Sequence, residues 1–174
     1  MGPNTRLLEQ TQIVWGFGPV NMVTAANTGD AVSLKNYRRC LVLFVKGIGT
    51  AGDDPTLTVL QGTDVAFGTN KALTFTDIFV KADLTSLNQI GQWTQVTQAA
   101  ANTYVDTTHA EQAAIYAVEF KAEDLDIKNN YDCIRASVAD VGTAANTQLG
   151  TLLYILSDPI FSDAPENMAS AIVD

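Results

Sequence analysis

Histidine, cysteine and basic residues are scarce in this chain of 174 residues. His109 is the single histidine, which excludes a His-based metal cluster within one chain and leaves one residue for any Ser-His-Asp or Cys-His site. Lys and Arg number 10 against 19 Asp and Glu, so the formal net charge is −9. Because affinity for nucleic acid depends on clustered cations that displace counterions from phosphate, this balance argues against a nucleic-acid partner.

Long apolar runs are also missing. No stretch approaches the roughly 18 residues of a membrane-spanning helix, and no N-terminal run is long enough for a signal peptide. We therefore expect a soluble protein made in a reducing cytosol, with no membrane partner. Cys40 and Cys133 both lie in strand-like patterns, where buried free thiols are the favoured interpretation and a disulfide is the alternative.

Apolar residues make up 47% of the chain and charged residues 17%, which is enough for one hydrophobic core at this length. Threonine is abundant, and its β-branched side chain suits the solvent-facing side of a sheet. Alternating apolar and polar residues recur along the chain with almost no helical period. The pattern predicts an all-β fold of about eight strands, a jelly-roll-like β-sandwich with extended N- and C-terminal arms.

The clearest alternation lies between Ala113 and Val141. It predicts two strands that each bury one face and fold back as a hairpin about the acidic segment 122–130. The residues expected in the core are Tyr116, Val118, Phe120, Ile134, Ala136 and Val138.

Other segments differ in the strength of their patterns. RRCLVLFVK at 38–46 predicts a central strand covered on both faces, and TLLYIL at 151–156 a final buried strand. The pattern weakens over 82–112, where we expect a strand at Trp93–Val96 and otherwise a long loop with at most one further short strand.

The two ends lack a core-like pattern. We expect an extended N-terminal arm at 1–18, a single sandwich domain at 19–158 and an extended, irregular tail at 159–174 that carries two prolines. Aromatic and apolar residues in the arm and tail predict contacts with neighbouring subunits. The candidate contact residues are Val14, Trp15, Phe17, Pro159 and Phe161.

Three chemical motifs are weak. Gly47–Gly52 matches G-x-G-x-x-G, but Asp53 and Asp54 and then a strand pattern follow it, so we interpret it as a hairpin loop and not as a nucleotide site. His109 lies in a polar segment and is expected to be exposed and without a role. For Glu123 to Asp126 a solvated turn or a subunit contact is favoured over a metal site.

The aromatic residues leave two alternatives. Trp15, Trp93 and Tyr104 are expected to pack in the core, with a sugar-stacking platform as the alternative. No catalytic, cofactor-binding or metal-binding residue is assigned.

Several phrases together resemble a family of tailed-bacteriophage capsid cement or decoration (auxiliary head) proteins. They are VSLKNYRRCLVLF, the pair PTLTVLQGTDVA and KALTFTDIFVK, VEFKAEDLDIKNNYDCIRASVADVGT and LGTLLYILSDPIFSDAP, and they extend from about Asp30 to the C-terminus. The resemblance implies a small structural protein of the virion, made in the host cytoplasm and located on the capsid surface. It also implies a jelly-roll or related β fold, often a trimer, and no catalytic residues.

We therefore expect a non-enzymatic capsid cement protein, a homotrimer that binds the outside of the head and bridges subunits of the major capsid protein. The alternatives are a carbohydrate-binding or receptor-binding jelly-roll module, a structural protein of the tail or neck, and a hydrolase that uses paired carboxylates at Glu123 and Asp126. Composition does not separate a head location from a tail location.

Overall fold

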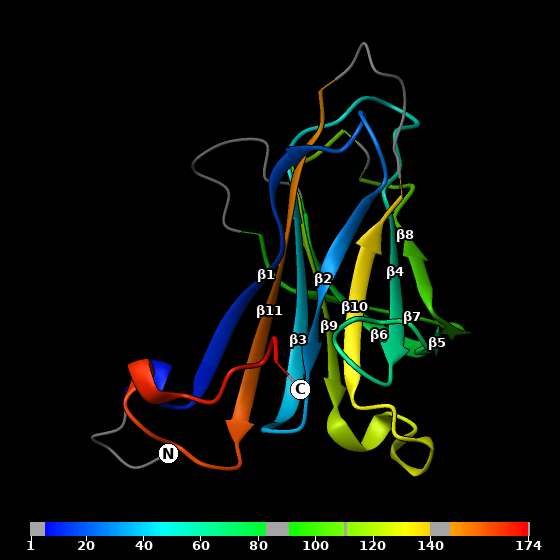
Figure 1. Cartoon of the computed structure of the whole chain (residues 1–174). Helices are drawn as coiled ribbons and strands as arrows, with labels where there is room; N and C mark the ends of the chain where they lie inside the picture. Colours follow the sequence, from blue (N-terminus) through cyan, green and yellow to red (C-terminus); the bar gives the residue numbers. More distant parts are fainter. Residues whose placement is uncertain (1–5, 83–90, 110, 140–146, 174) are drawn as a thin grey trace.

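The computed structural model describes residues 6–82, 91–109, 111–139 and 147–173. Two antiparallel sheets pack face to face, which confirms the predicted all-β sandwich (Figure 1). The six-stranded sheet has the order β1-β11-β3-β9-β6-β7 and the five-stranded sheet contains β2-β10-β4-β5, with β8 also paired to β4. No helix in these described ranges is long and apolar enough to span a membrane.

The strands vary from three to eleven residues, and the helical elements are short 3-10 turns. The elements in chain order are η1 (Leu7–Glu9), β1 (Thr11–Asn21), β2 (Asn27–Ser33), β3 (Tyr37–Lys46), β4 (Thr56–Gly62), β5 (Asn70–Ala72), β6 (Phe75–Lys81), β7 (Thr94–Ala101), β8 (Thr103–Val105), β9 (Ala114–Lys121), η2 (Ala122–Asp124), η3 (Ile127–Asn129), β10 (Cys133–Val138), β11 (Leu149–Pro159) and η4 (Pro165–Asn167).

The pairing of the strands is nested. β1 pairs with β11, β2 with β10, β3 with β9 and β4 with β5, so the first and second halves of the chain run alongside one another. In Figure 1 this places β1, in dark blue, beside β11, in orange. β6, β7 and β8 lie between β5 and β9 in the sequence; β6 and β7 extend the six-stranded sheet beyond β9.

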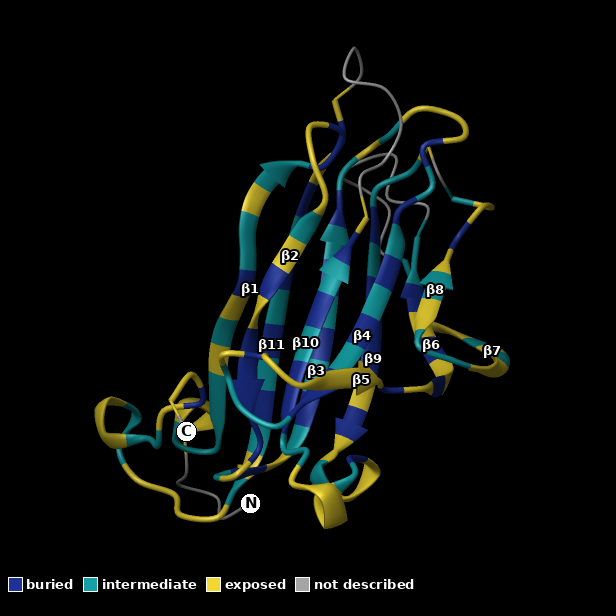
Figure 2. Cartoon of the chain, turned by 45° about the vertical axis from the view of Figure 1, so that its right-hand side comes forward, coloured by how far each residue is buried: buried dark blue, intermediate teal, exposed yellow. Residues whose placement is uncertain are grey.

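The core lies between the two sheets and is made by alternate residues of the longer strands other than β7, as the colouring by burial shows (Figure 2). Burying each large aliphatic or aromatic side chain there stabilises the fold by about 1.5–3 kcal/mol. Both cysteines are buried and neither forms a disulfide, and burial raises the pKa of the Cys40 thiol. The six residues expected in the core from the 113–141 pattern are all buried, namely Tyr116, Val118, Phe120, Ile134, Ala136 and Val138.

The predicted hairpin at 113–141 was wrong. β9 belongs to the six-stranded sheet and β10 to the five-stranded sheet, and the acidic segment with η2 and η3 connects one sheet to the other. Two strands that each bury one face satisfy the same alternation whether they pair side by side or lie in facing sheets. The pattern therefore specified the buried faces and not the pairing.

The N-terminal arm expected at 1–18 needs correction, because β1 begins at Thr11 and pairs with β11 along the edge of the six-stranded sheet. β1 contains Gly16, Gly18 and Pro19. In the structure a Cβ on Gly16 would lie 2.0 Å from the Leu152 side chain, so glycine lets β1 pass over the core. Pro19 is accommodated because β1 is an edge strand and one side of it carries no ladder hydrogen bonds.

The tail after β11 is irregular, as expected, but it is bonded to its own sandwich. Ile160 N–H donates to the carbonyl of Asn36 (2.9 Å), and Ser33 N–H donates to the carbonyl of Ala171 (2.6 Å). The hydroxyl of Tyr37, which is buried, donates to the carbonyl of Ala169 (2.5 Å). These bonds hold the tail against the end of β2 and the start of β3.

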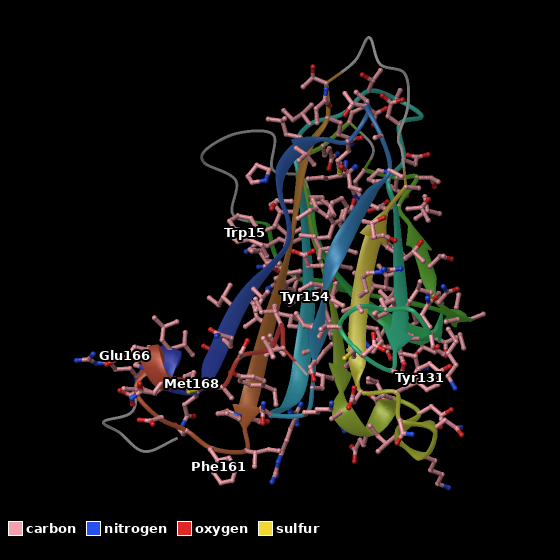
Figure 3. The ribbon with its side chains drawn as sticks, in the orientation of Figure 1. Trp15, Tyr131, Tyr154, Phe161, Glu166 and Met168 are labelled. Atoms are coloured by element: carbon pink, nitrogen blue, oxygen red, sulfur yellow. The ribbon has the colours of Figure 1, made fainter. Side chains whose placement is uncertain are left out.

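Tyr154 on β11 joins the two sheets. Its side chain is fully buried, and its hydroxyl accepts a hydrogen bond of 2.8 Å from the backbone N–H of Ala136 on β10 (Figure 3). The pairing of β10 with β2 shifts register between Arg135 and Ser137, so the hydroxyl provides a partner where the ladder is interrupted. A Cβ on Gly29, opposite this shift, would lie 2.5 Å from the carbonyl oxygen of Ala136.

The Tyr154→Phe variant should leave the Ala136 N–H buried without its partner. We expect the free energy of unfolding to fall by about 1–3 kcal/mol, as measured by urea denaturation. Tyr131→Phe is the matched control, because Tyr131 is half-buried outside the core and its ring contact with Lys71 survives the change. Equal stability of the Tyr154→Phe variant and the wild type would contradict the bridging role.

Candidate functional site

The six-stranded sheet has an apolar face that points away from the core. The strand at residues 38–46 was expected to be covered on both faces, and this was wrong for β3. Its inward residues such as Phe44 are buried, whereas the alternate residues are half-buried on the opposite side, namely Leu41, Leu43 and Val45. β11 repeats the arrangement with Leu153 and Ile155. The near-continuous apolar run at 38–46 therefore supplies side chains both to the core and to the opposite, outward side of the sheet.

Strand register aligns these residues into a row. The directly paired residues are Trp15 with Leu153, Leu153 with Leu43, Leu43 with Ala117 and Ala117 with Phe79. Paired residues share a face, so the row crosses five strands and is about 19 Å long at the usual strand spacing. We define the outer apolar face as Ile13, Trp15, Leu41, Leu43, Val45, Phe79, Ile115, Ala117, Leu153 and Ile155.

Charges lie at the margins of the outer apolar face and are largely neutralised there. Arg39 bonds to Glu119 (2.7 Å) and to Asp158 (2.9 Å), and the hydrogen bond to Glu119 is the main reason that the pKa of Arg39 is raised. At the β6 margin the ammonium group of Lys81 lies 5.8 Å from the centre of the Trp93 ring. The centre of the face is left to apolar side chains.

The structure separates the predicted contact residues. Trp15 lies on the outer apolar face and is 53% exposed, whereas Val14 and Phe17 pack against the core from the same strand. Pro159 ends β11 and is half-buried. Phe161 is 80% exposed on the tail, at the margin of the molecule (Figure 3). Of the five, Trp15 is the one that joins the other apolar side chains of the sheet.

The three aromatic residues considered for a sugar platform do not come together. Trp15 lies on one edge strand and Trp93 directly precedes the other, about 24 Å apart across five strand spacings. Tyr104 packs against Tyr116, with ring centres 5.9 Å apart. Core packing, the favoured interpretation, was wrong for the two tryptophans, since Trp15 and Trp93 are each about half exposed.

A second feature is a pocket of about 410 Å³ between β6, β7 and the segment that contains β8. Val80, Val96 and Tyr104 line it together with Asp106 and His109. Burial raises the pKa of the Tyr104 hydroxyl to about 12, so this group stays protonated at neutral pH.

Asp106 organises the polar end of this pocket. One carboxylate oxygen accepts hydrogen bonds from the N–H groups of Thr108 (2.9 Å) and His109 (3.2 Å). The other lies 2.7 Å from Nδ1 of His109 and accepts from the Tyr116 hydroxyl (3.2 Å). Burial would raise the pKa of Asp106, but the hydrogen bonds from His109 and Thr108 outweigh it and lower the pKa.

The expectation that His109 has no role needs correction, because its ring is paired and partly buried. Sequence reasoning also missed Asp106, although Asp is a common turn residue because its side chain can accept from the backbone N–H two residues on, as it does here from Thr108. An Asp-His pair can orient an imidazole for catalysis, but a nucleophile must lie within hydrogen-bond reach. Among the described residues no Ser, Thr or Cys side chain has a recorded hydrogen bond to the His109 ring.

Lys46 bonds to the backbone at His109 and Gln112. Its side chain is buried, and its ammonium group donates to the carbonyls of His109 (2.7 Å) and Gln112 (2.8 Å). Burial lowers the pKa of Lys46, while Asp106 and two other nearby carboxylates oppose the shift. The polar end of the pocket is therefore stabilised by the hydrogen bonds of Lys46 and Asp106.

The acidic segment forms no paired-carboxylate site. Asp126 is ion-paired with Lys71, whose hydrogen bond lowers the pKa of the carboxyl, and Asp124 accepts from the Lys121 N–H (2.7 Å). Glu123 is exposed and lies near Lys121. In the described ranges no group of three or more His, Cys, Asp and Glu side chains could hold a metal ion.

The glycine motif at Gly47–Gly52 lies in the connection between β3 and β4. A strand and not a helix follows it, which agrees with its interpretation as a loop.

Comparisons of the chain with protein-family models, with curated proteins and with solved structures give no match. The likeness to phage decoration proteins therefore rests on the sequence phrases quoted above. The fold defines the class of the protein as an all-β sandwich, and function has to be inferred from its surfaces.

The Asp106 cluster should make stability depend on pH. Because its pKa is lowered in the folded state, Asp106 contributes stability that is present above the unfolded pKa of about 3.9 and is lost as the pH falls through the folded pKa. Asp106→Asn should cost about 1–3 kcal/mol at pH 6, and the difference from wild type should shrink below about pH 4.

Urea denaturation at a series of pH values measures this effect, with Glu166→Gln on the exposed η4 turn as the control. The same loss of stability at pH 3 and pH 6 for Asp106→Asn would exclude the ionised carboxylate as its cause.

Proposed function

We propose that this chain is a non-enzymatic structural protein that attaches the outer apolar face of its six-stranded sheet to the subunits of a larger protein assembly. Following the resemblance, the assembly is a bacteriophage head and the chain is a cement protein on its surface, bridging subunits of the major capsid protein. The outer apolar face is the observation that carries the proposal.

The central row of the outer apolar face is about 19 Å long, and the rows on either side are shorter because Glu119 and Lys81 occupy positions in them. Contiguous apolar patches on a protein surface are often functional. Ile13 and Trp15 are 51% and 53% exposed, and Phe79 is 38% exposed. Aromatic residues at the two ends of a flat apolar row suit a protein interface, because interfaces are enriched in such anchors.

The nested strand pairing supports the jelly-roll part of the proposal. β1-β11-β3-β9 and β2-β10-β4-β5 are two four-stranded units that a long folded hairpin would produce, with β6 to β8 as an insertion. Jelly rolls of eight strands are common in viral capsid domains and also in lectins. The scattered positions of Trp15, Trp93 and Tyr104 favour the capsid role over the lectin role.

The electrostatics of the chain also suit this role. A net charge of −9 keeps the protein away from packaged nucleic acid, and the ion pairs of Arg39 leave little net charge beside the outer apolar face. Burial of the face against a shell subunit would add apolar contact area at every copy around the head.

A double variant tests the attachment. Trp15→Lys with Phe79→Lys places a charge at each end of the apolar row, where both side chains are exposed in the free protein. We expect its affinity for capsids assembled from the major capsid protein of the same source to fall roughly tenfold or more, as measured by co-sedimentation. Deletion of residues 1–18 is a poor test because it removes most of β1.

Ile127→Lys is the matched control, since Ile127 is also about half exposed but lies on η3, away from the outer apolar face. Binding of the double variant at wild-type affinity would refute attachment through this face. Binding of the wild type to tails or necks, and not to heads, would instead support the alternative of a structural protein of the tail or neck.

A further inference from the structure

The four sheet edges of the sandwich differ in how they are protected. An edge strand exposes unpaired N–H and C=O groups, and proteins block such edges with proline, bulges, charges, short strands or a covering segment. β1 has Pro19 and two register shifts against β11. β5 and β8 have three residues each, and the end of β2 is bonded to the tail through Ser33.

Among the described residues β7 has one of these protections, a bulge against β6 where Phe75 pairs with Ala101 and Asp77 with Thr97. It contains eight residues, TQVTQAAA, with no proline and no charge, and in the described ranges it pairs with β6 alone. None of its residues is buried, and five are exposed. Figure 2 shows it at the right-hand margin of the molecule.

The charge distribution indicates what pairs with this edge. The chain has a net charge of −9, so a second copy is repelled over most of its surface. No charged residue occurs between Asp83 and Asp106, and this interval includes all of β7. A second copy can therefore bring its own β7 alongside without placing like charges against one another.

We propose that β7 pairs with β7 of a second copy of this chain, antiparallel about a twofold axis. Such a contact is isologous, so each strand supplies the same groups to the other and the pairing closes at two copies. The six-stranded sheets of the two copies become one continuous sheet, by the same strand addition through which extended peptides bind exposed edges. The resemblance implies a trimer, whereas this contact produces a dimer.

Sedimentation analysis of the purified full chain tests the stoichiometry, and charge variants test the surface. Thr97→Lys with Ala99→Lys places like charges across the twofold axis near the middle of β7. We expect the dissociation constant of the dimer to rise roughly tenfold. Thr97→Glu with Ala99→Glu should have a similar effect, and an equal mixture of the two double variants should recover the dimer, because opposite charges then face each other.

Recovery in the mixture also shows that both double variants are folded. Thr69→Lys, on an exposed loop, is the control and should dimerise as the wild type does. Hydrogen exchange should slow at the amides of β7 in the wild-type dimer and not in the lysine double variant. A wild-type monomer or trimer, or a dimer unaffected by the lysine pair, would overturn the proposal.

Discussion

The hydrogen bond from the Ala136 N–H to the Tyr154 hydroxyl links the two sheets through the core. It occurs where β2 leaves the register of β10, so a backbone donor that lacks a ladder partner is satisfied from the opposite sheet. The contact requires β2 to approach closely, and Gly29 permits this because it has no side chain. Around this contact the core is formed by the buried residues that alternate along β3, β10 and β11.

The six-stranded sheet has more apolar residues than its core-facing side can bury. A two-layer sandwich covers one face of each sheet, yet β3 and β11 carry apolar side chains on both faces. Strands with this composition usually lie in sheets covered on both sides. The described residues supply one cover, the five-stranded sheet, and the outer apolar face is the surface for which a second cover would come from another protein.

The buried faces could be predicted from the sequence, because burial leaves a period of two in segments such as 113–121 and 133–138. The pairing of β9 and β10 could not, since the same period fits one sheet or two facing sheets. β7 was predicted only in part, as a strand at Trp93–Val96, for a related reason: a strand exposed on both sides has no apolar period. Asp106 and His109 lie in a segment with only a turn signal, and the hydrogen bond that Asp106 accepts from the Tyr116 hydroxyl depends on the tertiary fold.

The two proposed contacts use different groups of the same sheet and can therefore operate together. β7 would pair through backbone groups in the plane of the sheet, whereas the outer apolar face would bind through side chains perpendicular to it. A twofold pair would present two such faces side by side on one continuous sheet. Two weak attachments that are linked in this way bind more tightly than either alone when the spacing of the partner subunits matches, because the second attachment is intramolecular. The modest area of one face is then sufficient for stable attachment to a repetitive surface.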